Sequence, residues 1–190
     1  MRVALLGGTF NPVHIGHLYI AQCALEELGY DRIYFVPTSK PAHKEVEVEV
    51  GPRVRARMVE LAVGRNPGFG CDDSEVCRGG TSYTIDTVRQ LEERYRPEGR
   101  FGVLIGDDLL QGFPCWKEAE RLAEAADLVV FHRNSIERVP FGYRHVYLNN
   151  MIVSVSSTEV RQSVRLGRTI RYLVPEPVRL FIERHGLYRD

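Results

Sequence analysis

The chain opens with the stretch Val3-Ala4-Leu5-Leu6-Gly7-Gly8-Thr9-Phe10-Asn11-Pro12-Val13-His14-Ile15-Gly16-His17. Four consecutive apolar residues come first, and two glycines close the run. An apolar run of this length closed by glycines is typical of a strand buried on both faces of a parallel sheet. Pro12 then precedes a segment in which apolar residues recur every three or four positions from Gly16 to Leu28, and Gly29 supplies a stop. The stretch therefore predicts a strand, a turn and a helix.

The same alternation continues along the chain. Residues 33–36 form a second apolar run before Pro37, which completes a β-α-β start. Further helical periods lie at 54–62 and 85–91, and further strands are predicted at 101–105 and 128–131. Strands that alternate with amphipathic helices favour parallel pairing, so we expect an α/β fold: a doubly wound, Rossmann-like parallel sheet with helices on both faces. Ligands of such sheets bind at the carboxyl ends of the strands.

Composition narrows the function classes. The chain has 190 residues, the length of one ordinary domain, so residues 1–190 are expected to form a single domain. Its 25 basic and 25 acidic side chains give no net charge, which argues against nucleic acid or an anionic membrane as partner. Four scattered cysteines indicate neither a zinc site nor a disulfide framework, and no apolar stretch is long enough for a membrane. We expect a soluble, cytoplasmic protein with reduced thiols.

The glycine turn is the first candidate site. Gly7 and Gly8 let main-chain N–H groups approach a ligand closely, which suits a phosphate, although neither GxGxxG nor GxxxxGK[ST] is present. His14 and His17 lie three apart at the positive end of the predicted helix, with Gly16 between them. Two imidazoles and free amides around one anion would stabilise charge that grows on a phosphate chain. The alternative is a glycine turn with two incidental surface histidines.

A second candidate lies near the C-terminus. Residues 153–161 alternate like a strand and then place Ser156 three residues before Glu159, which is the pattern of a capping box that opens a helix. Arg161, one turn further on, can add a forked guanidinium to an anion at that helix end. The alternative is an ordinary well-capped helix.

These two motifs resemble those of a known superfamily. His14-Ile15-Gly16-His17 is similar to the His-x-Gly-His signature of nucleotidyltransferases, which share their fold with class I aminoacyl-tRNA synthetases, and residues 156–161 are similar to their Ser-Ser-Thr-x-Val/Ile-Arg motif. From Met1 to about Tyr188 the chain resembles bacterial nicotinate-mononucleotide adenylyltransferases. The segments that carry this further likeness are 37–44, 82–87, 105–108, Trp116 and 172–188.

The resemblance implies a single nucleotidyltransferase domain that transfers the adenylyl group of ATP to nicotinate mononucleotide in NAD biosynthesis, with Mg²⁺ held mainly by phosphates and no metal site of its own. The implied catalytic residues are His14, His17, Lys44 and Arg161. The implied ATP-binding residues are Gly7, Gly8, Thr9, Phe10, Gly106, Asp108, Arg133, Ser156, Ser157 and Thr158. The implied acceptor-binding residues are His43, Tyr83, Thr84 and Trp116.

Some of these roles have a physical basis and a simpler rival. The indole of Trp116 can stack on a pyridine ring, or it can fill the core. Tyr83 and Thr84 begin a predicted helix whose N-terminus can hold a carboxylate, or they can be a plain helix start. Asp108 follows a buried strand and can bind the ATP ribose or orient a metal-bound water. Asp107 stands where the family usually has a small, uncharged residue, and its orientation is open. Asn134 and Ala42 each replace a proline that is common in the family.

Several alternatives stay open. Residues 45–50 alternate strictly and are either an edge strand or, as we expect, a mobile surface loop that closes on substrate. The rival acceptors are nicotinamide mononucleotide and phosphopantetheine, and the rival class is a non-catalytic nucleotide-binding sensor. A nucleic-acid module is disfavoured by the neutral charge. A homo-oligomer and the degree of acid-over-amide selectivity are left open.

Overall fold

The structure, a computed structural model, describes residues 1–42 and 50–189. A sheet of six parallel strands forms its centre, in the order β4-β2-β1-β6-β7-β8. Its strands are β1 (Val3–Gly8), β2 (Arg32–Pro37), β4 (Phe69–Cys71), β6 (Gly102–Gly106), β7 (Asp127–Phe131) and β8 (His145–Tyr147). Two further strands of two residues each, β3 (Lys40–Pro41) and β5 (Thr81–Ser82), pair in parallel beside it.

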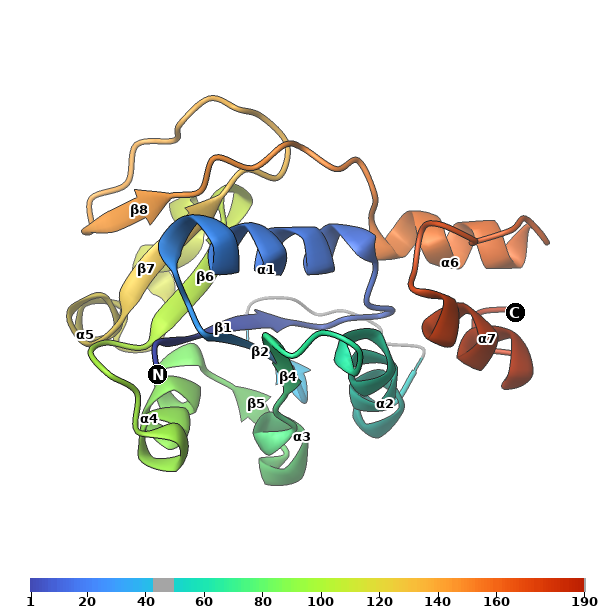
Figure 1. The fold of residues 1–190 in the computed structure, drawn as a ribbon, viewed down its shortest axis with the longest axis horizontal. Coiled ribbons are helices and arrows are strands. Elements are labelled where there is room, and N and C mark those ends of the chain that lie inside the picture. Colours follow the sequence, from blue (N-terminus) through green and yellow to red (C-terminus); the bar gives the residue numbers. More distant parts are fainter. Residues whose placement is uncertain (43–49, 190) are drawn as a thin grey trace.

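Helices cover both faces of the sheet. They are α1 (Ile15–Leu28), α2 (Pro52–Val63), α3 (Ser74–Arg78), α4 (Thr84–Tyr95), the 3₁₀ helix η1 (Asp107–Cys115), α5 (Ala119–Ala125), α6 (Ser157–Arg165) and α7 (Glu176–Arg184). One apolar cluster joins the sheet to α1, α2 and α7, and a second joins its other face to α4, η1 and α5. Figure 1 shows α1 and α4 on opposite sides of β1. The alternating side chains of each strand supply both clusters, which is why the strands are apolar throughout.

The strand order reverses at β1. This strand pairs with β2 on one side and with β6, nearly seventy residues further along the chain than β2, on the other. A crevice therefore opens between the carboxyl ends of β1 and β6, the usual ligand position in a doubly wound sheet. In Figure 1, α6 lies at this end of β1, beside the N-terminus of α1. The fold thus brings the two sequence motifs to one place.

The predicted fold class is confirmed, and so are the predicted strands and the first helix. Helix α1 ends where Gly29 adopts a left-handed conformation with φ of 65° and donates its N–H to the carbonyl of Leu25. The strand-like pattern at 153–155 was misleading, because this segment forms no strand and leads directly into α6. Strand β8 was not predicted; it is an edge strand of three residues, with Val146 51% exposed.

The predicted loop at 45–50 lies outside the described residues except for Val50, which is buried. Among the residues described, no helix is both long enough and apolar enough to cross a membrane.

Candidate active site

The two histidine rings lie against each other, tilted, at the start of α1. Their ring centroids lie 3.7 Å apart with an interplanar angle of 34°. The main-chain N–H of His14 donates a hydrogen bond to Nδ1 of His17 at 3.2 Å. An added Cβ at Gly16 would stand 3.1 Å from the imidazole of His14, so the glycine leaves room for this packing. The spacing of three residues therefore places both imidazoles on one face, as the sequence predicts.

Both imidazoles are held neutral. Burial lowers the pKa of His14 from its ordinary value to about 4, helped by the charge of Arg133 and opposed by Glu159. Burial also holds the pKa of His17 well below its ordinary value, and the neighbouring His14 and Arg133 add to this effect. Two adjacent imidazoles in a cationic environment resist protonation until an anion arrives. The pair is therefore prepared for a polyanion.

The glycine turn packs against the same pair. Phe10 is buried, has a positive φ of 47°, and presents its ring edgewise to His17 at a centroid distance of 4.9 Å. A Cβ at Gly8 would stand 3.1 Å from the Phe10 ring, so any larger residue here would require the buried ring to shift. The Phe10 ring thus supports the imidazole of His17, while residues 7–9 line the pocket.

Helix α6 docks onto this turn. The hydroxyl of Ser157 donates to the carbonyl of Pro12 at 2.8 Å, and Nη1 of Arg161 donates to the carbonyl of Asn11 at 2.9 Å. The predicted capping box is present, since Ser156 and Glu159 bond reciprocally at the helix start. The N-terminus of α6 and the N-terminus of α1 thus meet at one rim, and both carry the positive end of a helix dipole. Such an arrangement favours a polyanion between them.

A pocket of about 420 Å³ runs from this rim across the sheet ends. Of the predicted site residues that the structure describes, all but three line it. Those that line it are Gly7, Gly8, Thr9, Phe10, His14, His17, Thr84, Gly106, Trp116, Arg133, Ser157, Thr158 and Arg161. The three that do not are Tyr83, Asp108 and Ser156. His43 and Lys44 lie outside the described residues.

The three residues off the pocket wall have visible structural partners. Ser156 caps α6. Asp108 forms an ion pair with Arg133, with 3.0 Å between Oδ2 and Nη1. The ring of Tyr83 lies 4.9 Å from Nζ of Lys117, while its main chain begins α4.

The side chain of Asp107, whose orientation the sequence left open, is buried. Its side chain is only 6% exposed, and its Oδ1 accepts a hydrogen bond from the main-chain N–H of Arg133 at 3.1 Å. Its Oδ2 lies 3.6 Å from Nδ1 of His132. Asp107 therefore points inward and fixes the main chain of the segment that carries Arg133.

Several residues of the site were missed by sequence reasoning. Asn11 is buried, and its Oδ1 accepts a hydrogen bond from the hydroxyl of Tyr188, 177 positions away. Arg55 is buried beneath the glycine turn. Glu75 lines the far end of the pocket and is bonded to Thr87 on α4. None of these three belongs to a local pattern that indicates its partner.

Comparison with known proteins agrees with this geometry. Residues 5–163 match the family described as Cytidylyltransferase-like. The chain is 38% identical over 188 residues to the probable nicotinate-nucleotide adenylyltransferase of Borreliella burgdorferi, covering 99% of this chain and 97% of the relative. It is 42% identical over 189 residues to the protein of the same name from Exiguobacterium sibiricum, covering 99% of both.

Solved structures share the fold. The nicotinic acid mononucleotide adenylyltransferase of Plasmodium falciparum complexed with NaAD superposes with a TM-score of 0.79 at 17% identity, covering 98% of this chain and 97% of that one. The putative nicotinate-nucleotide adenylyltransferase of Vibrio parahaemolyticus gives a TM-score of 0.71 at 18% identity, covering 100% and 97%. The family match and the full-length relatives together show that the chain belongs to the cytidylyltransferase-like family and, within it, to the nicotinate-nucleotide adenylyltransferases.

Proposed function

We propose that this chain transfers the adenylyl group of ATP to nicotinate mononucleotide, giving nicotinate adenine dinucleotide and pyrophosphate. The observation that carries the proposal is the docking of α6 onto the histidine turn, which places Arg161 and the α6 N-terminus beside His14 and His17. Two helix N-termini, a guanidinium and two imidazoles at one rim form a site for a triphosphate.

The chemistry is an in-line displacement. A phosphate oxygen of the mononucleotide attacks the α-phosphorus of ATP, the new P–O bond forms, and the bond from the α-phosphorus to the bridging oxygen breaks with its electron pair on pyrophosphate. The attacking oxygen is already anionic, so no general base is required. The protein contributes by positioning two anions and by neutralising charge that shifts to pyrophosphate. His17 and Arg161 are suited to the second task by their position.

The choice of acceptor is supported at the other end of the pocket. Thr84 is the first residue of α4, and it lines the pocket together with Trp116. A carboxylate on a pyridine ring would meet the positive end of α4 while the ring stacks on the indole. A neutral carboxamide gains less from a helix dipole, which favours the acid. The names of the relatives from Borreliella burgdorferi and Exiguobacterium sibiricum, which specify nicotinate nucleotides, agree with this choice.

We propose Mg²⁺ as the accompanying ion. The described residues include no group of three or more His, Cys, Asp or Glu side chains placed to hold a metal. Mg²⁺ is commonly bound through one or two carboxylates and the phosphates of a substrate rather than by a cage of protein ligands, so we propose that ATP carries the ion. When bound, Mg²⁺ neutralises phosphate charge. His43 and Lys44 are proposed to reach the acceptor phosphate, on family resemblance.

We further propose that residues 1–190 act as one nucleotidyltransferase domain in the cytoplasm. The four cysteines, at 23, 71, 77 and 115, are all free thiols, as expected in a reducing compartment. A homo-oligomer is compatible with the proposal, and light scattering of the purified protein would decide it.

The deciding experiment compares acceptors. Purified protein with Mg-ATP is given nicotinate mononucleotide, nicotinamide mononucleotide or phosphopantetheine, and pyrophosphate release is measured at steady state. We expect the highest kcat/KM with nicotinate mononucleotide. A higher value with either rival would reassign the acceptor, and tight ATP binding without product from any acceptor would make the chain a nucleotide-binding sensor instead.

A further inference from the structure

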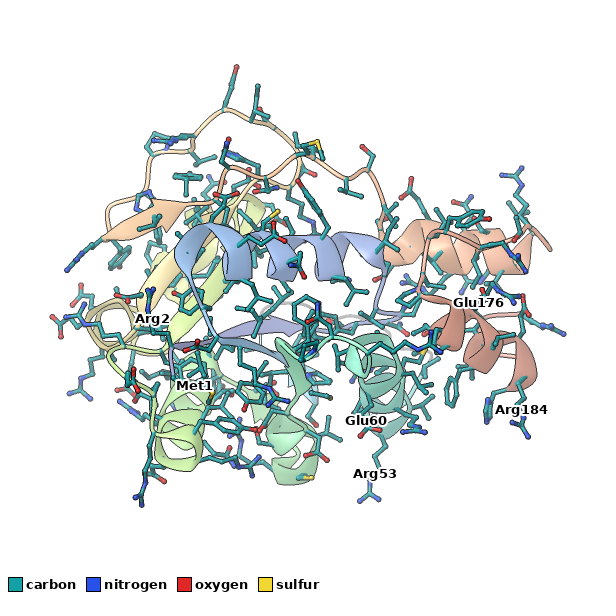
Figure 2. All side chains as sticks on the ribbon, in the orientation of Figure 1. Met1, Arg2, Arg53, Glu60, Glu176 and Arg184 are labelled. Carbon is teal, nitrogen blue, oxygen red and sulfur yellow. The ribbon has the colours of Figure 1, made fainter. Side chains whose placement is uncertain are left out.

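Helix α2 carries three arginines in very different environments. Arg53 and Arg57 are exposed, and Figure 2 shows Arg53 pointing away from the molecule. Arg55, between them, is 1% exposed and, among the described residues, is the largest of the fully buried side chains. Arginine is among the residues least often fully buried. Its position therefore requires an explanation.

The guanidinium of Arg55 binds only main-chain carbonyls among the described residues. Nη1 donates to the carbonyl of Thr9, and Nη2 donates to those of Thr38 and Ser39 at 2.7 and 3.1 Å. Nε donates to the carbonyl of Val50 at 3.2 Å. The fork thus ties the glycine turn after β1 to the segment after β2.

Under the proposed function these two segments serve different substrates. Thr9 and Thr38 both line the pocket, and Thr9 belongs to the turn that is proposed to face the triphosphate. From Ser39 the connection continues, because its N–H donates to the hydroxyl of Ser82 at 3.2 Å. Ser82 lines the pocket two residues before Thr84, which begins α4. Hydrogen bonds therefore link the ATP turn, through Arg55 and Ser39, to Ser82, and two residues of main chain then lead to the proposed carboxylate site.

The charge of Arg55 fits this position. Burial lowers the pKa of Arg55, but a guanidinium stays protonated in proteins. A buried cation without a carboxylate partner is costly unless its N–H groups are satisfied, and here the carbonyls satisfy them. The cost is offset further when anionic substrates occupy the pocket above. The free protein thus keeps a fixed positive charge behind the site for two anions.

We propose that Arg55 is a positioning residue that couples the ATP half of the site to the acceptor half, so that each substrate binds more tightly when the other is present. This inference rests on the proposed function. The coupling arises because a shift of Thr9 is transmitted through one rigid planar group to Thr38 and Ser39. A lysine keeps the charge but lacks the planar fork, so it cannot hold both segments at once.

The test compares Arg55→Lys with Arg53→Lys, an exposed control on the same helix. Calorimetry measures the affinity of nicotinate mononucleotide with and without a non-hydrolysable ATP analogue, and steady-state assays give kcat. In the wild type and the control we expect the analogue to tighten acceptor binding at least about fivefold. In Arg55→Lys we expect that factor to fall close to one and kcat to fall about tenfold or more, because the reacting groups are misaligned.

A purely structural role would lower the melting temperature of Arg55→Lys and leave the coupling factor and kcat of the folded protein unchanged; that result would overturn the proposal. So would the absence of coupling in the wild type. If Arg55→Lys does not fold, Ser82→Ala is tested instead, because this change removes the hydroxyl that accepts a hydrogen bond from the N–H of Ser39. An unchanged coupling factor in Ser82→Ala would then overturn the proposal. Failure of the proposed function is distinguishable, because the wild type would then make no dinucleotide.

Discussion

The hydrogen bond from the main-chain N–H of His14 to Nδ1 of His17, 3.2 Å long, determines which nitrogen of His17 carries its proton. Since Nδ1 accepts, the neutral ring must hold its hydrogen on Nε2. His17 is therefore fixed as a hydrogen-bond donor at Nε2 without carrying a net charge. It can meet a phosphate oxygen as a neutral donor.

Replacing His17 should impair turnover far more than folding. We expect His17→Ala to lower kcat by roughly 100–1000-fold, the range for loss of one preorganised donor in a transition state. Its melting temperature should change only by a few degrees. Pyrophosphate release and thermal unfolding check the two quantities, with His185→Ala, an exposed histidine at the end of α7, as the control. Pyrophosphate release at the wild-type rate from His17→Ala would remove this residue from the mechanism.

Binding of ATP should be accompanied by proton uptake. Burial lowers the pKa of His14 to about 4 and holds that of His17 well below its ordinary value, so both are neutral at pH 6 in the free protein. A triphosphate beside them raises the pKa of His14, because an opposite charge favours the protonated form. Calorimetric titrations at pH 6 in two buffers of different ionisation enthalpy should therefore give different observed enthalpies. The difference should shrink in His14→Gln, and equal enthalpies in both buffers for the wild type would contradict the prediction.

The same depressed pKa predicts how stability depends on pH. Below the ordinary pKa of about 6.5 the unfolded chain binds a proton at His14 that the folded protein does not bind until about pH 4. The unfolded state thus holds more protons in this window, so the free energy of unfolding falls as the pH drops from 6.5 toward 4. Denaturant unfolding at pH 7 and pH 5 measures how much the free energy of unfolding decreases between these two pH values. We expect this decrease to be smaller in His14→Asn than in the wild type by roughly 1–2 kcal/mol. An equal loss in both proteins would contradict this assignment.

Arg161 should be sensitive to a conservative change. Its Nη1 donates to the carbonyl of Asn11, its Nη2 donates to the hydroxyl of Thr158 at 3.4 Å, and the residue lines the pocket. Lysine lacks the planar fork that makes these two contacts at once. We therefore expect Arg161→Lys to raise the KM for ATP and lower kcat, together by about tenfold to a hundredfold in kcat/KM, whereas Arg165→Lys on the exposed part of α6 leaves both unchanged. Initial-rate measurements with varied ATP decide this, and equal kinetics in the two variants would rule out the role.

The ATP half of the site was open to prediction from the sequence because its geometry is local. The spacing of His14 and His17 and the capping box of Ser156 and Glu159 each lie within one helical turn, where residue spacing fixes direction. The docking of Arg161 onto Asn11 joins residues 150 positions apart, and here only the family resemblance placed the motifs together. Residue spacing alone does not predict a contact between segments so far apart in the sequence.

The remainder depends on tertiary packing. Nothing near Arg55 in the sequence distinguishes it from its exposed neighbours on α2, since its partners are carbonyls of distant segments. Asp108 was predicted from its place after a strand; its side chain pairs with Arg133, and it is not among the residues that line the pocket. A polar side chain at a strand end can bond to any of several neighbours, and the tertiary fold determines which of them lies within reach.

Trp116 offers a direct optical test of the acceptor end. It is the only tryptophan of the chain, and it lines the pocket with Thr84 while its ring lies 5.1 Å from that of Phe113. A pyridine ring stacked on the indole should quench its fluorescence, so nicotinate mononucleotide should change the emission and ATP alone should change it little. Trp116→Phe keeps an aromatic surface and should raise the KM for the acceptor only a few fold. Trp116→Ala should raise it about fivefold or more, since a stacked pair contributes about 1 kcal/mol beyond burial. The KM for ATP should stay constant in both variants. Quenching by ATP alone, or a parallel rise of both KM values, would place the indole at the ATP end of the pocket or in the core.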